Sequence, residues 1–339
     1  MSRPPVDSPP RTSGPVPRPR PVALVGPTAS GKTSLALAVA RARDRGAPPV
    51  ELVSVDSMAV YRGMDIGTAK PSAAVRSEVP YHLIDAVDPS DEFTVQQFQA
   101  AALSVLDGIA DRGHRALLVG GTALYLRSLI DDLTFPGRFP DVAAALVAEL
   151  DDAGRPDSPE ALSALAGLHA RLADLDPVAA ARMEPTNRRR VIRALEVTMG
   201  SGRPFSSFGP GLEAYPETRF ALVGLPLAAD IDRRIEERFA AQMEAGFLDE
   251  VRELAARSGG LSRTARQALG YRELLSHVED GVALEAARSE AVRRTRVFAR
   301  RQWAWFRRDP RIVWVGAQED LVARVDAAFA GEGFHRVGN

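Results

Sequence analysis

The chain has 339 residues, of which 45% are hydrophobic and 26% charged, as expected of a soluble globular protein large enough for two domains. Its formal net charge of −1 means that affinity for nucleic acid must come from local patches, and the lack of cysteine excludes disulfides and thiolate metal sites. No apolar run approaches the roughly 18 residues of a membrane span, and the first twenty residues lack the apolar core of a secretory signal, so we expect a cytoplasmic protein with no membrane partner.

A proline-rich tail precedes the first regular elements. Residues 1–20 contain seven prolines, with serine and arginine between them, so we expect a disordered tail. Val22–Val25 is an apolar run that predicts the first strand, and Thr33 to about Arg43 predicts the first helix. The sequence GPTASGKT lies between them, and this is the strand, loop and helix context of a phosphate-binding P-loop.

The P-loop predicts a site for a di- or triphosphate. Gly26 and Gly31 allow the tight bend that brings backbone amides to a polyanion, and the helix N-terminus adds partial positive charge. Lys32 supplies a point charge for terminal phosphate oxygens, and Thr33 supplies a hydroxyl ligand for Mg²⁺. Lys32 and Lys70 are the only lysines among 43 basic residues, which draws attention to both. The residues predicted to bind the phosphates are Gly26, Pro27, Thr28, Ala29, Ser30, Gly31, Lys32 and Thr33.

Two further predicted strands end on polar or glycine-rich sequence. Glu51–Val55 ends on Asp56, which could hold Mg²⁺ through water or take a proton, although a turn or capping role is the plainer alternative. Arg115–Val119 ends on Gly120, Gly121 and Thr122. Because ligands of open α/β sheets gather at the carboxyl ends of strands, these residues are a second candidate wall of the site.

The sequence between these strands contains a loop and a helix. Gly63–Pro71 has no regular period and carries Lys70, the second rare lysine. His82 has no visible partner in the sequence, and a lone histidine of this kind is more often structural than catalytic. The apolar face of Phe93 to about Arg112 predicts a helix.

Residues 141–200 are rich in alanine and leucine, contain no strand candidate and predict an all-helical insertion. Within them, Asn187–Arg193 carries four arginines and no acid. Such a run is often a solvated helix face, but this density of arginine also makes contact with a phosphate backbone plausible.

The C-terminal part returns to the α/β pattern. Arg219–Leu225 predicts a fourth strand, and the apolar spacing from Ile231 to Leu254 predicts one long amphipathic helix. Leu284–Arg308 predicts a further helix and Arg311–Val315 a last strand. We therefore predict an α/β fold with a P-loop NTPase-like parallel sheet. Its core comprises residues 21–135 and 201–330, and its helical insertion comprises residues 136–200.

Several strings together carry a family resemblance. GPTASGKT, SVDSMAVY, GMDIGTAKP, GGTALY and RALEV occur in this order, followed by Gly270-Tyr271-Arg272 and Arg301-Gln302. The chain resembles bacterial tRNA dimethylallyltransferases over about residues 22–317. The P-loop alone would be weak support for this resemblance, whereas the nine-residue string GMDIGTAKP, from Gly63 to Pro71, is highly specific.

The resemblance implies an activity and a set of site residues. It implies that the P-loop binds dimethylallyl diphosphate with Mg²⁺, that the dimethylallyl group passes to N6 of the adenosine 3′ of the anticodon, and that the insertion clamps the anticodon stem-loop. Asp56, Thr33 and Arg238 would be catalytic, with Arg234 as a further diphosphate ligand. The implied tRNA contacts are Asp56, Ser57, Met58, Ala59, Thr122, Arg189, Arg190, Val191, Ile192, Arg193, Gln267, Gly270, Tyr271 and Arg272.

The chain departs from the family pattern in three places. Ala143 stands where relatives often carry arginine, Ala59 where they often carry a larger residue, and the proline-rich tail has no counterpart. Two other functions share the P-loop. An ATP-dependent kinase would need an adenine pocket, and an RNA-binding NTPase would hydrolyse nucleotide without transfer. We expect the protein to act as a monomer.

Overall fold

The computed structural model describes residues 19–42, 47–155, 158–209, 211–316 and 319–331, so most of the predicted tail lies outside the described residues. These residues form two compact units. The first takes the chain up to Leu126 and from Thr218 onward, and the second is Arg127–Glu217. Among the described residues, no helix is long and apolar enough to cross a bilayer.

The first unit contains a six-stranded sheet, which confirms the predicted α/β fold. The strand order is β3-β2-β4-β1-β5-β6 and all pairs are parallel. The strands are β1 (Val22–Val25), β2 (Val50–Val55), β3 (Tyr81–His82), β4 (Arg115–Gly120), β5 (Ala221–Gly224) and β6 (Ile312–Trp314). Every residue of β1, β2 and β5 is buried, as expected of parallel strands that are covered on both faces.

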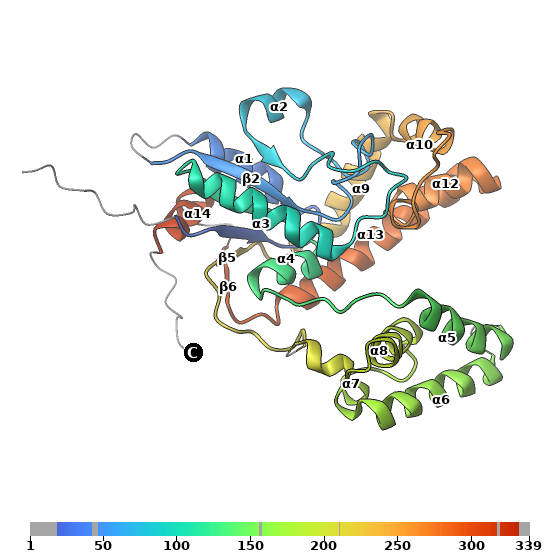
Figure 1. The fold of residues 1–339 in the computed structure, drawn as a ribbon. Helices are drawn as coiled ribbons and strands as arrows, with labels where there is room; N and C mark the ends of the chain where they lie inside the picture. Colours follow the sequence, from blue (N-terminus) through green and yellow to red (C-terminus); the bar gives the residue numbers. More distant parts are fainter. Residues whose placement is uncertain (1–18, 43–46, 156–157, 210, 317–318, 332–339) are drawn as a thin grey trace, which may run out of the picture. The chain divides into compact units, whose positions relative to one another are not determined.

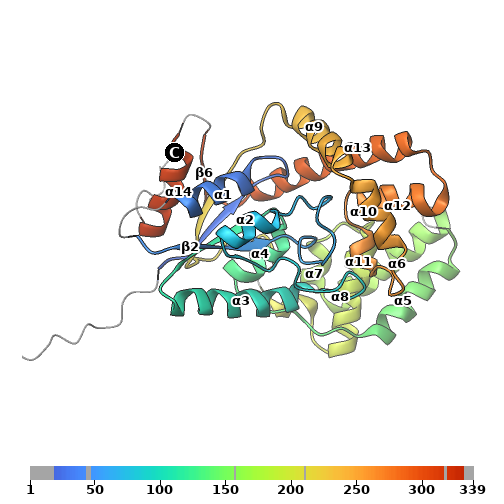
Figure 2. The same ribbon diagram turned by 90° about the horizontal axis from the view of Figure 1, so that it is seen from above.

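Helices cover both faces of this sheet. On one face, α1 (Lys32–Arg41) and α14 (Leu321–Ala330) pack on the central strands through a core that includes Leu24 and Leu117. Helix α3 (Val95–Asp111) contacts β2 and β4 and lies across the sheet from α1 in Figure 2. Two shorter helices lie between these elements in the sequence. Helix α2 (Ala73–Glu78) precedes β3, and α4 (Ala123–Ile130) follows β4.

Five further helices gather at one end of the sheet in Figure 1. They are α9 (Ile231–Glu244), α10 (Phe247–Ala255), α11 (Arg263–Arg266), α12 (Tyr271–Asp280) and α13 (Leu284–Phe306). A second apolar cluster, built around Phe239, Phe247 and Tyr271, joins α9, α10 and α12. It also takes in Val60 and Met64 from the segment after β2, so it ties these helices to the sheet.

The structure corrects the prediction of one helix from Ile231 to Leu254. The helix ends at Glu244 and restarts at Phe247, because Gly246 adopts a φ of 97° that no helix can contain. The apolar spacing continues across the break, since both helices pack on the same cluster. Strand β3 was not predicted because its two residues are too few to show a period, and helices α2 and α14 were not predicted either.

All the regular elements in the described residues of the second unit are helices. It contains α5 (Pro140–Asp152), α6 (Pro159–Leu175), α7 (Pro177–Ala181), α8 (Arg188–Ser201) and the short 3₁₀ helix η1 (Phe205–Phe208). Helices α5, α6 and α7 begin on proline, whose missing amide costs nothing in the first turn. Leu146, Leu168 and Leu195 belong to the core that α5, α6 and α8 share.

A buried carboxylate fastens the sheet at the start of β2. Glu51 is only 4% exposed and accepts hydrogen bonds of 2.6 Å from both His82 Nε2 and His114 Nδ1. Arg112 donates to both carboxylate oxygens at 3.0 and 2.8 Å. Burial alone would raise the pKa of Glu51, but the bonds from Arg112, His82 and His114 outweigh it and hold the pKa at about 2. The partner that the sequence did not reveal for His82 is therefore Glu51.

We predict that Glu51→Gln lowers the free energy of unfolding by about 2 kcal/mol near neutral pH, because it removes a charge that three neighbours share. The contribution of Glu51 is complete above its unfolded pKa near 4.5 and is lost as the pH falls towards 2. Urea unfolding at several pH values measures it. Glu78→Gln is the control, because the Arg41–Glu78 pair is roughly half exposed and should contribute less than about 1 kcal/mol. Equal losses for both variants would contradict the prediction.

Candidate active site

The strand register brings three predicted segments to one edge of the sheet. Val25 of β1 pairs with Gly120 of β4, and Val55 of β2 pairs with the same glycine. The residues that follow these strand ends are Gly26, Asp56 and Gly121. The P-loop, the Asp56 turn and the Gly121–Thr122 segment therefore start level with each other.

The P-loop has the bent backbone that its glycines predict. Gly26 and Gly31 both have positive φ, 151° and 89°, and Gly31 caps α1. Lys32 turns back over the loop, where its ammonium donates to the carbonyl oxygen of Pro27 and lies 3.4 Å from Ser30 Oγ. Thr33 follows in the first turn of α1, as a P-loop hydroxyl should.

Arg238 of α9 joins the P-loop, and Arg234 does not. Arg238 Nη1 donates to Thr28 Oγ1 at 3.1 Å. Arg234, one turn earlier, pairs with Asp230 at 2.7 Å and its side chain is 45% exposed. Of the two arginines predicted at the diphosphate, the structure therefore favours Arg238, and the carboxylate of Asp230 explains why Arg234 is drawn away.

Lys32 and Arg238 make this a strongly cationic site. Burial, together with the neighbouring charge of Arg238, lowers the pKa of Lys32 to about 7, while Asp56 acts in the opposite direction. Burial also lowers the pKa of Arg238, with Asp56 again opposing. Neither cation forms an ion pair with any residue in the described part of the chain. Because two neighbouring partly buried cations are costly without a counter-charge, the arrangement suits an anion.

Asp56 is both a turn residue and a candidate base. Its Oδ1 accepts from the amides of Met58 at 2.8 Å and Ala59 at 3.3 Å, which is the turn role that the sequence left open. These two bonds fix the orientation of the carboxylate. Its charge acts on both Lys32 and Arg238, so Asp56 lies near the cationic site.

Thr122 connects the Asp56 turn to the glycine-rich segment after β4. Thr122 Oγ1 accepts from the amide of Ser57 at 3.1 Å. On the other side, the buried side chain of Gln302 from α13 donates from Nε2 to the carbonyl oxygen of Gly121 at 2.9 Å and accepts from the amide of Thr28 at 2.8 Å. Gln302 was part of a family string but was not predicted as a site residue, because nothing local in the sequence shows a bond to a residue 274 positions away.

The loop Gly63–Pro71 is fixed from two sides. The carboxylate of Glu250 accepts from the amides of residues 65, 66 and 67 at 2.7–3.2 Å and from the hydroxyl of Tyr271 at 2.5 Å. Lys70 is 1% exposed and donates to Tyr61 O, Asp65 and Asp85 at 2.5–2.7 Å. The second rare lysine therefore fixes the loop rather than offering its charge to a ligand.

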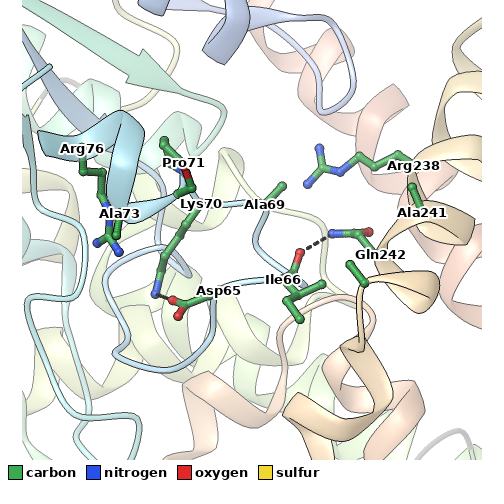
Figure 3. A pocket seen from close by; sticks show the side chains of 12 residues that line it. Asp65, Ile66, Ala69, Lys70, Pro71, Ala73, Arg76, Arg238, Ala241 and Gln242 are labelled. Carbon is green, nitrogen blue, oxygen red and sulfur yellow. Dashed lines mark hydrogen bonds and ion pairs between the residues drawn. The ribbon is translucent and has the colours of Figure 1, made fainter. Parts of the chain in front are cut away.

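A pocket of about 530 Å³ lies between this loop and α9 (Figure 3). Figure 3 shows Arg238 reaching towards Ala69, and Gln242 bonded to the carbonyl oxygen of Ile66 at 2.7 Å. The remaining wall combines small or apolar side chains with charged ones. The lining residues are Asp65, Ile66, Ala69, Lys70, Pro71, Ser72, Ala73, Arg76, Arg238, Ala241, Gln242 and Ala245. Arg238 therefore belongs to both the pocket and the P-loop surroundings.

The residues predicted to contact tRNA fall into exposed and buried groups. Arg189 and Arg190 are exposed on the first turn of α8 and form no ion pair with a described residue, whereas Arg193 is tied to the carbonyl oxygens of Pro136 and Gly137 at 2.9 and 3.1 Å. Ile192 is half-buried beside the helical core.

Three of the predicted tRNA contacts have buried side chains. Val191 is 0%, Tyr271 1% and Ala59 8% exposed, which removes their side chains from the predicted contact surface. Neither the apolar periodicity nor the family strings distinguish a side chain that packs beneath the surface from one that is exposed on it. In the same predicted segment Gln267 and Arg272 are exposed and bonded to each other at 3.1 Å, and the amide of Gly270 donates to Glu273 at 2.9 Å.

We predict that the affinity for an unreactive alkyl diphosphate falls above pH 7, because Lys32 then loses its proton in the free protein and must regain it to hold the anion. The association constant should drop by up to about tenfold per pH unit between pH 7 and 9. Calorimetric titration across this range measures the slope. Lys32→Gln is the control, because it removes the titrating group and leaves only the ionisation of the ligand. Parallel curves for the two proteins would contradict the prediction.

Comparisons with known proteins show to which family the chain belongs. The family described as IPP transferase matches residues 59–309. The tRNA dimethylallyltransferase of Kineococcus radiotolerans is 44% identical over 311 residues, which cover 90% of this chain and 94% of the relative. That of Acidothermus cellulolyticus is 46% identical over 88% of this chain and 90% of its own length. The solved structure of a tRNA isopentenylpyrophosphate transferase from Bacillus halodurans is 34% identical, with a TM-score of 0.62 over 92% of this chain and 97% of that one. The chain therefore belongs to the IPP transferase family.

Proposed function

We propose that the protein transfers the dimethylallyl group of dimethylallyl diphosphate to N6 of the adenosine 3′ of the anticodon in tRNA. Family membership and the names of relatives that align over nearly the whole chain support this assignment. The observation that carries it structurally is the cationic pair Lys32 and Arg238 beside the oriented carboxylate of Asp56. Prenyl transfer to an amine needs these two features together, a place for a departing diphosphate and an acceptor for a proton.

The reaction breaks one bond and forms one. The bond between C1 of the dimethylallyl group and the diphosphate oxygen breaks, and its electron pair leaves with the diphosphate. The backbone amides of the P-loop, together with Lys32 and Arg238, stabilise the negative charge that develops on that oxygen. The lone pair of N6 forms the new bond to C1, and the proton that N6 loses passes to Asp56.

The proposal includes Mg²⁺ bound with the diphosphate. Mg²⁺ usually keeps several waters and binds through one or two protein oxygens together with substrate phosphates. The hydroxyl of Thr33 and the carboxylate of Asp56 have the right chemistry for this, and the described residues contain no cluster of three or more His, Asp or Glu side chains that could hold the ion alone. When bound, the ion would neutralise part of the diphosphate charge.

For the tRNA, we propose that the helical segment 136–200 contacts the anticodon stem-loop. The support is the exposed pair Arg189 and Arg190, which form no ion pair with a described carboxylate. An RNA backbone carries closely spaced phosphates that could pair with both arginines. Arg188 in the same turn is already paired with Asp151 at 2.6 Å. We retain the prediction of a monomer, which sedimentation with and without tRNA would test.

One assay tests the assignment against the kinase and NTPase alternatives. The protein is incubated with unmodified tRNA and either dimethylallyl diphosphate labelled in the prenyl group or ATP labelled in its terminal phosphate. Label should pass from the prenyl donor to tRNA. Phosphoryl transfer from ATP to a small molecule, or hydrolysis of ATP without any prenyl transfer, would reject the proposed function.

We predict that Asp56→Asn lowers kcat by about 10²–10⁴-fold, because the amide cannot accept the proton of N6. The amide oxygen can still accept from the amides of Met58 and Ala59, so the turn should survive and the diphosphate affinity should stay near wild type. Lys32→Ala should instead damage both binding and rate, because its charge meets the ligand before and during departure. Kd and single-turnover measurements separate the two. If Asp56→Asn loses diphosphate or Mg²⁺ binding as badly as Lys32→Ala, Asp56 is a metal ligand rather than the base.

A second prediction concerns the arginines of α8. Replacing Arg189 and Arg190 with alanine should weaken tRNA binding and reduce the slope of log K against log salt by roughly one unit per lost phosphate contact. Diphosphate affinity should not change. Arg171→Ala is the control in the same unit, because Arg171 is exposed but already lies 3.6 Å from Glu149. An unchanged slope in the double variant would mean that these arginines only solvate the helix.

A further inference from the structure

We propose that Gln302 is a positioning residue that sets the spacing between the diphosphate loop and the segment carrying Thr122. This inference rests on the proposed function, since it assigns Gln302 to the alignment of the two reactants. Its side chain is 7% exposed and uses both ends of its amide. Oε1 accepts from the backbone amide of Thr28 at 2.8 Å, and Nε2 donates to the carbonyl oxygen of Gly121 at 2.9 Å.

The two bonds join the loop after β1 to the segment after β4. No other described side chain forms hydrogen bonds to the backbone of both. Thr28 belongs to the loop after β1, and Gly121 to the segment after β4. Next to Gly121, Thr122 accepts from the amide of Ser57, the residue after Asp56. One continuous chain of hydrogen bonds and backbone therefore runs from the P-loop through Gln302 and Thr122 to the turn that holds the proposed base.

Gly121 is built around the Gln302 side chain. A Cβ on Gly121 would overlap Nε2 of Gln302, while the nearest atom outside Gln302, the carbonyl oxygen of Gly26, would lie at 3.3 Å. Only glycine therefore lets the glutamine amide lie against this backbone. The missing side chain of Gly121 leaves the space that the Gln302 amide occupies. A glutamine that only filled the core would not require this space.

The contact with Thr28 also determines which groups remain for the ligand. With its amide bonded to Gln302 and its hydroxyl to Arg238 at 3.1 Å, Thr28 is held from both sides. The Thr28 amide is then an anchor of the loop rather than a phosphate donor. The remaining loop amides, Lys32 and Arg238 are left to meet the diphosphate.

This role predicts a loss of rate at nearly constant affinity. When the loops can shift relative to each other, C1 and N6 lose their alignment, and a displacement of about 1 Å can reduce a rate by about 10²-fold. Gln302→Met keeps the approximate volume and removes both hydrogen bonds, so we expect kcat to fall by about 10- to 100-fold. The KM for dimethylallyl diphosphate should change by less than about threefold, because the phosphate-binding groups remain.

A double-mutant cycle with Gly121 provides the second readout. Gly121→Ala should reproduce the kcat loss by displacing the glutamine amide. The cycle pairs it with Gln302→Ala, which lacks the overlapping atom, so Gly121→Ala should lower kcat much less in the Gln302→Ala background than in the wild type. Gly167→Ala, at an exposed position on α6 with open space around it, is the matched glycine control and should leave kcat unchanged. Thermal unfolding of every variant confirms that the chain remains folded at the assay temperature.

The outcomes separate this inference from the proposed function. If the wild-type protein transfers no prenyl group, the proposed function fails. If the wild type is active and Gln302→Met keeps its kcat, or if the two substitutions add without coupling, the positioning role is wrong. Tighter binding of dimethylallyl diphosphate to Gln302→Met would also overturn it, because Gln302 would then compete with the ligand for the Thr28 amide. A rate loss confined to kcat and strong coupling to Gly121 would establish it.

Discussion

The placement of two cations, Lys32 and Arg238, in partly buried surroundings is the constraint on which the site depends. Burial lowers the pKa of both groups, the charge of Arg238 lowers that of Lys32 further, and the carboxylate of Asp56 acts in the opposite direction, so the two charges are unfavourable in the ligand-free protein. The surrounding fold must therefore hold them together. It does so through the backbone of α1 on one side and the packing of α9 against the core on the other. Under the proposed function, a bound diphosphate would supply the counter-charge and convert this cost into binding energy for an anion.

The sheet supplies the alignment that makes this arrangement useful. Because β1, β2 and β4 end in register, the P-loop and the Asp56 turn follow directly from the ends of the two strands that flank β4 rather than from long loops. The loop Gly63–Pro71 could have been a flexible flap, yet Glu250 and Lys70 take up its backbone and side-chain groups. One wall of the pocket next to Arg238 is therefore rigid before any ligand arrives.

Patterns within a short stretch of sequence were sufficient for the sheet core and the P-loop. Buried strands are short apolar runs, and a glycine-rich loop with this spacing between a strand and a helix is typical of a phosphate site. What the sequence could not show is which long-range partner each side chain takes. Asp230 pairs with Arg234, and the side chains of Val191 and Tyr271, which were predicted to contact tRNA, are buried. The break at Gly246 was hidden because the apolar spacing runs through it, and Gln302 was hidden because its partners lie far away in the sequence.

The two lysines also show that the sequence does not reveal the partners of a side chain. In a chain that otherwise uses arginine, the retention of Lys32 and Lys70 drew attention to both positions, but rarity cannot separate an ammonium that binds a ligand from one that holds the fold. The difference lies in the acceptors. Lys70 is buried and points its three donors at Tyr61 O, Asp65 and Asp85, and a planar guanidinium could not reach three such oxygens around one point. Among the described residues, the hydrogen-bond partners of Lys32 are a carbonyl and a hydroxyl oxygen of its own loop, neither of which neutralises its charge, so a phosphate oxygen would be a stronger partner for it.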